Sequence, residues 1–138
     1  MPGSARWSTA ASGPRRPAKA EMHSVLPADE QRRAANRTLR FEGESYGSGV
    51  SLFLVDNEPG EGPRLHRHPY SETWIVRSGR ALFTADSSEL EAGDGDILVV
   101  GPHTPHKFVN LGPGRLELIC VHDSPTIIQE ELEEPAGV

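Results

Sequence analysis

Apolar residues recur from Thr38 onward in short segments that turn residues separate. Residues 38–42 alternate apolar with charged side chains, which predicts a half-buried β-strand because strand side chains point alternately to opposite faces. Residues 51–55 form a continuous apolar run, as expected of a strand covered on both faces. Further segments that predict strands occupy residues 64–68, 72–77, 81–85, 96–100, 106–110 and 115–122.

Turn signals lie between these segments. Residues 56–60, with the sequence DNEPG, form a strong turn signal, and Ser78-Gly79 predicts a hairpin between its flanking segments. Residues 86–95 predict turns with a short exposed piece around Leu90. Roughly eight to ten short strands without long helical periodicity predict an all-β sandwich or barrel. A jelly roll is one such architecture, and its interior can hold a ligand.

The first part of the chain lacks the strand pattern. Residues 1–37 are expected to be a mostly disordered extension, rich in Pro, Gly, Ser and basic residues at its start, with no acidic residue before Glu21. An organelle-targeting segment is an alternative interpretation, and translation could begin at Met22 instead of Met1.

The remaining boundaries follow from the change of pattern. Within the extension, residues 28–37 allow a short helix with Asp29 as its N-cap. Residues 38–123 are expected to form one domain. The acidic tail, residues 124–138, is expected to be solvated and to make one helical turn or two.

Composition narrows the classes of function. The chain has 138 residues, enough for one domain, and its low hydrophobic fraction of 36% predicts that part of it is unpacked. A net charge of −6 argues against a nucleic-acid-binding surface, which needs a basic patch. The single cysteine, Cys120, excludes an intramolecular disulfide and fits a reducing, cytoplasmic compartment. No apolar run approaches the ~20 residues of a membrane-spanning helix.

Candidate metal ligands gather in residues 60–79. His66 and His68 stand two positions apart in a predicted strand, so both imidazoles point to the same face. Glu72 opens the next apolar segment, where an antiparallel neighbour could bring it to the pair. His106 begins a segment further along the chain. Imidazoles and a carboxylate that converge on one point are ligands for a divalent transition metal ion.

These spacings resemble the two sequence motifs of the cupin family. The first motif places Gly, His-x-His, Glu and Gly at the positions of Gly60, His66, His68, Glu72 and Gly79. The second places Gly, His and Asn at the positions of Gly95, His106 and Asn110. Gly101 and His103 stand where that motif has Pro and Gly. Residues 80–94 form a short spacer, like that of small single-domain bacterial cupins, and the match extends from about Leu39 to His122.

The resemblance implies a small jelly-roll β-barrel that holds one divalent metal ion through His66, His68, Glu72 and His106. The ion could be iron, manganese, nickel, zinc, cobalt or copper, since all of them accept imidazole. The resemblance also implies a homodimer through sheet packing. A small molecule would bind inside the barrel, next to the ion.

Three further side chains are candidates for the substrate pocket. Trp74 shares the face of Glu72, and Phe108 shares that of His106. Most such aromatic residues belong to the core, but in a ligand-holding barrel they also line the pocket. His103 is more readily a loop histidine, although near the barrel mouth it could act as an acid or base.

Other polar residues have plainer interpretations. His122 shares parity with Leu116, Leu118 and Cys120 and is interpreted as a satisfied histidine at a strand end. Cys120 is interpreted as a small core residue rather than a nucleophile. Arg64 is interpreted as a solvated residue, with a contact to an anionic substrate as the alternative.

Two classes of function fit this ligand set. One is a metal-dependent enzyme, such as a dioxygenase, an isomerase or a related lyase, that acts on a small organic substrate. The complete ligand set favours it. The alternative is a non-catalytic barrel that contains a metal and binds or senses a small molecule, which the small size of the chain favours. The sequence assigns no residue as catalytic.

Overall fold

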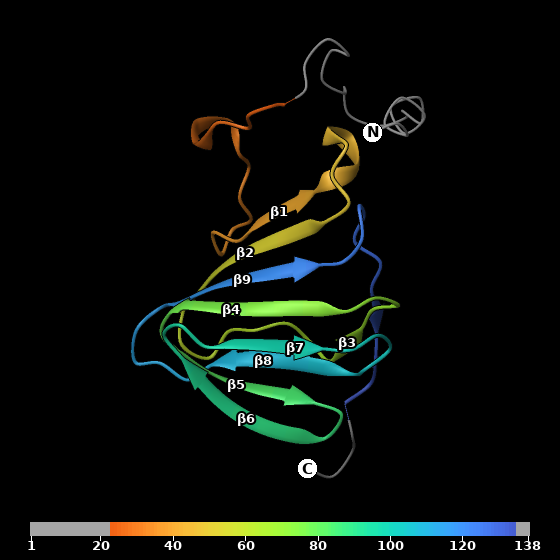
Figure 1. The fold of residues 1–138 in the computed structure, drawn as a ribbon. Coiled ribbons are helices and arrows are strands. Elements are labelled where there is room, and N and C mark those ends of the chain that lie inside the picture. The colour runs from red at the N-terminus through yellow and green to blue at the C-terminus, as the bar shows by residue number, and fades with distance from the viewer. Residues whose placement is uncertain (1–22, 135–138) are drawn as a thin grey trace.

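The structure, a computed structural model, describes residues 23–134 (Figure 1). Two five-stranded antiparallel sheets lie face to face, which confirms the all-β prediction. Sheet A has the order β1 (Leu39–Glu42), β2 (Ser51–Asn57), β9 (Leu116–His122), β4 (Glu72–Ser78) and β7 (Ile97–Val100). Sheet B has the order β10 (Glu130–Glu131), β3 (His66–Arg67), β8 (His106–Asn110), β5 (Arg80–Ala85) and β6 (Ser88–Gly93).

The core lies between the inner faces of the two sheets. Alternate residues of β4 and β9 are buried, as the period of two along a strand requires. Trp74 of sheet A packs on Phe83 of sheet B with ring centroids 4.6 Å apart, and both also contact the ring of Phe108. These aromatic contacts close one part of the interior, so that the space beside them is left for a site.

The hairpin predicted at Ser78-Gly79 is wrong, because the two strands that flank it belong to different sheets. β4 pairs with β7 and β9, whereas β5 pairs with β6 and β8. Gly79 has a φ of 103°, and a Cβ atom there would lie 2.6 Å from the carbonyl oxygen of Arg115. Glycine is therefore required at this corner, where the chain crosses from one sheet to the other.

Three local expectations are corrected. The helix expected in residues 28–37 is only a 3-10 turn, η1 (Ala28–Glu30), capped by Pro27, with Asp29 inside it. Residues 86–87 and 94–95 form the expected turns, but the exposed piece around Leu90 is a strand, β6, that covers residues 88–93. Residues 130–131 form a strand rather than a helical turn, because they pair with β3. A second 3-10 turn, η2 (Gly43–Tyr46), links β1 to β2.

Some expectations fall on residues whose structure is not described. The disorder expected at the start of the chain and the alternative start at Met22 lie there, as does the end of the acidic tail after residue 134. Within residues 23–134, no helix has the length and apolar character needed to cross a membrane.

Candidate metal centre

Two cross-strand pairs face each other at the centre of the molecule. In sheet B, His66 of β3 stands opposite His106 of β8. In sheet A, Glu72 of β4 stands opposite His122 of β9. His68 follows β3 directly. All five side chains are buried, with at most 5% of each residue exposed, so they meet in a space between the sheets.

The four predicted ligands come together. His66, His68, Glu72 and His106 each offer one ligand atom, and these atoms all lie within 4.8 Å of one another. Glu72 Oε1 lies 3.0 Å from His106 Nε2 and 3.2 Å from His68 Nε2. Strand pairing produces this cluster, because it places His66 beside His106 in one sheet and Glu72 beside His122 in the other.

Backbone carbonyl groups fix the orientation of the three ligand imidazoles. The Nδ1 atoms of His66, His68 and His106 lie 2.6, 2.7 and 2.7 Å from the carbonyl oxygens of Arg64, Ile128 and Thr104, respectively. A carbonyl oxygen only accepts hydrogen bonds, so each Nδ1 carries the proton and donates it. Each Nε2 then has a free lone pair, and those of His68 and His106 lie next to Glu72 Oε1, which is the arrangement of metal-ligating histidines.

The cluster therefore consists of acceptors and needs a cation. Among the described residues, His68 Nε2 is buried and has no hydrogen-bond partner. Burial lowers the pKa of His66 to about 4, although the hydrogen bond to Arg64 opposes this, so that imidazole is neutral near pH 7. A divalent metal ion satisfies three lone pairs and a carboxylate at once. The residues thus fit such an ion and could hold it.

Glu72 is held as a carboxylate. Burial alone would raise its pKa, but the side chains of His106, His122 and His68 around its oxygens outweigh burial and lower the pKa. Its second oxygen, Oε2, accepts a hydrogen bond from Trp74 Nε1 at 2.8 Å. Trp74, predicted as a pocket residue, thus orients a ligand, and it does not lie among the residues that line the cavity described below.

His122 is the site residue that the sequence interpretation missed. Its Nε2 lies 3.2 Å from Glu72 Oε2, and its Nδ1 lies 2.7 Å from the hydroxyl oxygen of Tyr70. Burial raises the pKa of Tyr70, which therefore keeps its proton. Unlike a carbonyl, a hydroxyl can donate, so Tyr70 donates to Nδ1 while it accepts the backbone N–H of Ile128 at 3.1 Å.

This network favours the opposite tautomer for His122. With Nδ1 as an acceptor, Nε2 carries the proton and faces the carboxylate of Glu72 rather than adding another lone pair to the cluster. Nε2 is buried and makes no aligned hydrogen bond within the described residues, and the His122 side chain lines the cavity described below. No local signal predicts this role, since it depends on the register between β4 and β9.

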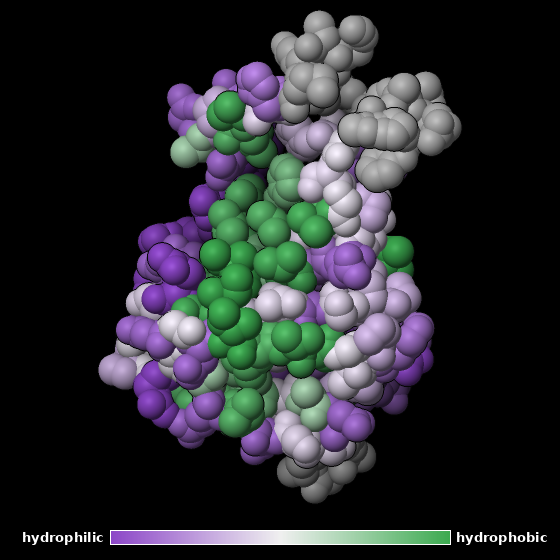
Figure 2. All heavy atoms as spheres, in the orientation of Figure 1, coloured by the Kyte–Doolittle hydropathy of each residue, from purple (hydrophilic) through white to green (hydrophobic). Residues whose placement is uncertain are grey.

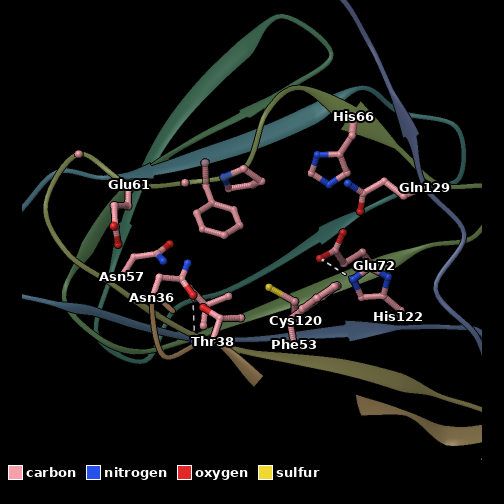
Figure 3. Close-up of a pocket in the computed structure, with 15 residues that line it drawn as sticks. Asn36, Thr38, Phe53, Asn57, Glu61, His66, Glu72, Cys120, His122 and Gln129 are labelled. Carbon is pink, nitrogen blue, oxygen red and sulfur yellow. Dashed lines mark hydrogen bonds and ion pairs between the residues drawn. The ribbon is translucent and has the colours of Figure 1, made fainter. Parts of the chain in front are cut away.

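A cavity of about 470 Å³ opens beside the ligands (Figure 3). His66, Glu72, His122 and Gln129 line one end, and Phe53, Val55, Phe108 and Cys120 line its apolar wall. Burial raises the pKa of the Cys120 thiol well above its usual range, and the charge of Glu72 adds to this, so the thiol stays protonated. Phe108 thus lies where a pocket residue was expected.

The two remaining candidates lie outside the lining of this cavity. His103 is exposed, and its backbone N–H donates to the carbonyl oxygen of His68 at 2.7 Å. Its φ of 62° marks a tight loop, as its turn position predicted. His103 therefore supports the segment at the end of β3 through its backbone. Arg64 is also exposed, and its Nε lies 3.8 Å from Glu131 Oε1.

Comparison with known proteins identifies the family. The cupin domain model matches residues 53–122, a range that contains all five buried side chains of the site. The chain belongs to the cupin family. A relative, the uncharacterized protein MJ1618 of Methanocaldococcus jannaschii, is 36% identical over 108 residues, which is 78% of this chain and 86% of that protein. The cupin jelly roll predicted from the motifs is thereby confirmed.

Two of the solved structures with the same fold have much longer chains. The formate complex of Lactobacillus farciminis oxalate decarboxylase has a TM-score of 0.64 at 22% identity, over 74% of this chain and 33% of that one. Bacillus subtilis oxalate decarboxylase, in a study of its Mn(II) centres, has a TM-score of 0.63 at 22% identity, over 70% and 28%. This cupin thus spans a third or less of those chains, and the likeness concerns the fold.

Proposed function

We propose that this cupin is a metal-dependent enzyme that acts on a small organic substrate in the cavity. The observation that carries this proposal is the position of the acceptor cluster, which is buried, oriented by backbone carbonyls and open to a cavity of about 470 Å³ through His66 and Glu72. Volumes of this size are typical of small-molecule sites. A structural metal site would instead be closed on all sides by its ligands.

The protein would supply positioning and a proton. When bound by His66, His68, Glu72 and His106, a divalent ion would supply Lewis-acid or dioxygen chemistry. The rings of Phe53 and Phe108 would exclude water from the substrate. His122 holds a proton at Nε2, beside Glu72 and at the cavity wall, and Tyr70 keeps that tautomer in place. Dioxygenase, isomerase and lyase reactions all use these functions.

Manganese is the first ion to test. The Mn(II) centres of Bacillus subtilis oxalate decarboxylase occur in a barrel of the same fold, and the formate complex of the Lactobacillus farciminis enzyme shows a small carboxylate bound to such a protein. Iron, nickel, zinc, cobalt and copper fit the same donors, and cellular supply decides among them. We propose small organic acids and other compounds with chelating oxygen atoms as the substrate class.

We also propose a homodimer, formed through the outer face of sheet A. Two cross-strand rows of side chains, all apolar except Thr73, cover this face, and Figure 2 shows a band of apolar residues that crosses the molecule. Ile97 and Val99 are 64% and 70% exposed. A second copy would cover such a face by two-fold symmetry. The rows consist of Leu54, Ile119, Ile75 and Ile97, and of Leu52, Val121, Thr73 and Val99. The single cysteine supports a cytoplasmic location.

Activity can be tested with a panel of small organic acids. The full chain would be loaded with Mn²⁺ or, without oxygen, with Fe²⁺, and products and dioxygen consumption would be measured by mass spectrometry and an oxygen electrode. We expect turnover of at least one compound and its loss in His106→Ala, since that variant removes a ligand. Binding of panel compounds by the loaded protein without any conversion would contradict the enzyme proposal and favour a non-catalytic binding module.

A further inference from the structure

The cavity has a second polar end, away from the ligands. Asn36, Thr38, Asn57 and Glu61 line it, and we refer to these four residues as the amide end. Figure 3 shows them on the opposite side of the cavity from His66, Glu72 and His122, with Phe53 and Cys120 between the two groups. A role in metal binding accounts for the polar residues His66, Glu72 and His122 at the first end. It does not account for the polar residues of the amide end, which apolar side chains separate from the metal ligands.

The carboxamide of Asn57 is the central feature of the amide end. Asn57 is only 3% exposed, and among the described residues no group hydrogen-bonds its side chain. Its backbone carbonyl accepts a hydrogen bond from Asn110 Nδ2 at 3.1 Å. Within the described residues, the amide atoms of Asn57 are not among the fully enclosed side-chain atoms that lack a hydrogen-bond partner, so they reach the cavity. They are therefore available to hydrogen-bond a bound molecule.

The two ends are separated by several residues of strand. Phe53 and Asn57 both lie on the inner face of β2, where Phe53 stands opposite Cys120 and Asn57 opposite Leu116. Four residues of extended chain correspond to roughly 13 Å. A molecule that reaches both the ligands and Asn57 must therefore be elongated, and its middle must be apolar, since Phe53, Val55 and Phe108 line that stretch.

The charges at the amide end favour a neutral group. The described residues that line the cavity include no lysine or arginine, whereas Glu61 contributes a carboxylate. Asn36 Oδ1 accepts the backbone N–H of Thr38 at 3.0 Å, which leaves its amide protons to donate. Thr38 Oγ1 accepts the N–H of Asp56 at 3.3 Å, which leaves its hydroxyl proton to donate. These donors suit a hydroxyl or carboxamide, and Glu61 would repel an anion.

We propose that the amide end is a recognition site for a neutral hydrogen-bonding group. The substrate of this cupin is then an elongated molecule that chelates the metal at one end, has an apolar middle, and ends in a hydroxyl or carboxamide that Asn57 binds. This assignment rests on the proposed function, because it takes the metal as the anchor of the first end. It adds the group that distinguishes the substrate from a small acid such as oxalate, which would leave the amide end empty.

The test compares three chelators with the same six-carbon chain. Hexanohydroxamic acid, its ω-hydroxy derivative and adipic monohydroxamic acid share one metal-binding group and differ only at the far end. Their affinities for the Zn²⁺-loaded full chain would be measured by calorimetry, since zinc is redox-inert and reports binding alone. We expect the hydroxy compound to bind about five- to tenfold more tightly than the methyl-ended one, and the carboxylate-ended compound to bind most weakly.

Asn57→Leu should abolish the preference for the hydroxy compound while the methyl-ended compound still binds. Leu90→Ala, at an exposed position of β6 outside the cavity lining, is the control and should keep the preference. Equal affinities of the three compounds for the wild-type protein would overturn the amide end as a recognition site and leave the metal site standing. Failure of all three to bind a protein that contains zinc would overturn both this assignment and the proposed function. The comparison within the wild-type protein decides the question even if Asn57→Leu does not fold.

Discussion

At the scale of single residues, the site depends on hydrogen-bond partners that fix the orientation of the ligands. Three backbone carbonyls set the tautomers of the ligand histidines, and Trp74 Nε1 holds the far oxygen of Glu72. Such outer contacts tune metal affinity, because they decide which lone pair faces the ion. His122 differs only in that its Nδ1 meets a hydroxyl rather than a carbonyl, and this one difference makes it a donor.

Trp74→Phe tests the donor on Glu72. The variant keeps an aromatic ring in the core and removes the N–H. We expect the free energy of unfolding of the metal-free protein to fall by about 2 kcal/mol, since a buried hydrogen bond to a charged group is lost. We expect metal affinity to fall by about tenfold. Urea denaturation and calorimetric titration measure the two quantities. Phe83→Leu is the control, because it disturbs the same aromatic cluster and leaves the indole N–H in place. An equal loss of metal affinity in both variants would contradict the role of the N–H.

The pKa of His66 predicts how stability depends on pH. Burial lowers this pKa from 6.5 to about 4, so between these values the unfolded chain binds a proton that the folded protein excludes. The free energy of unfolding of the metal-free protein should therefore rise as pH rises through this window. The lowered pKa of Glu72 has the same sign and acts below its ordinary value of 4.5.

Urea midpoints measured across this pH range test the prediction. His66→Gln removes the titrating imidazole and should flatten the rise above the pKa of the carboxylates. A wild-type stability that is constant over the window, or that falls as pH rises, would show that His66 is not buried as a neutral imidazole.

At the scale of elements, strand pairing between distant segments builds the site. β3 pairs with β8 and β10, and β4 pairs with β9, so ligands from one stretch of sequence end in different sheets. The short C-terminal strand β10 matters because Ile128, just before it, supplies the carbonyl that His68 binds and the N–H that Tyr70 accepts. The acidic tail, expected to be solvated, is thus part of the site's support.

Truncation tests this role. A chain that ends at Thr126 lacks β10 and both contacts of Ile128, and its metal affinity should fall about ten- to a hundredfold, because His68 loses the acceptor that orients it. A chain that ends at Glu134 keeps every described contact of the segment and is the matched control. Calorimetric metal titrations of both would settle the point, and equal affinities would show that β10 does not support the ligands.

Local patterns explain what the sequence could predict. Alternation revealed most strands, and the His-x-His spacing put two ligands on one face, since both features depend on residues close in sequence. Three features of the site and fold could not be predicted from the sequence. The sheet change at Gly79, the partnership of Glu72 with His122 and the carbonyl of Ile128 all depend on pairings between residues far apart in sequence, and no periodicity specifies such pairings.

At the scale of the whole molecule, the proposed dimer can be tested by one charge. Val99 is 70% exposed on the outer face of sheet A, so Val99→Glu would place a carboxylate in the interface. We expect the wild-type protein to be a dimer by light scattering and the variant to be a monomer. Leu90→Glu, at a 57% exposed position on sheet B, is the control and should remain dimeric. A monomeric wild-type protein, or a dimeric Val99→Glu variant, would contradict this interface.

The central claim is that the buried cluster of His66, His68, Glu72 and His106 binds one metal ion. Mass spectrometry of metal content, on the protein as purified and after loading with Mn²⁺ under anaerobic conditions, tests it most directly. We expect about one ion per chain after loading. His106→Ala should lose that ion, and His23→Ala, an exposed position outside the barrel, should keep it. A folded wild-type protein without metal after loading, or a His106→Ala variant that retains the ion, would contradict the four-ligand site.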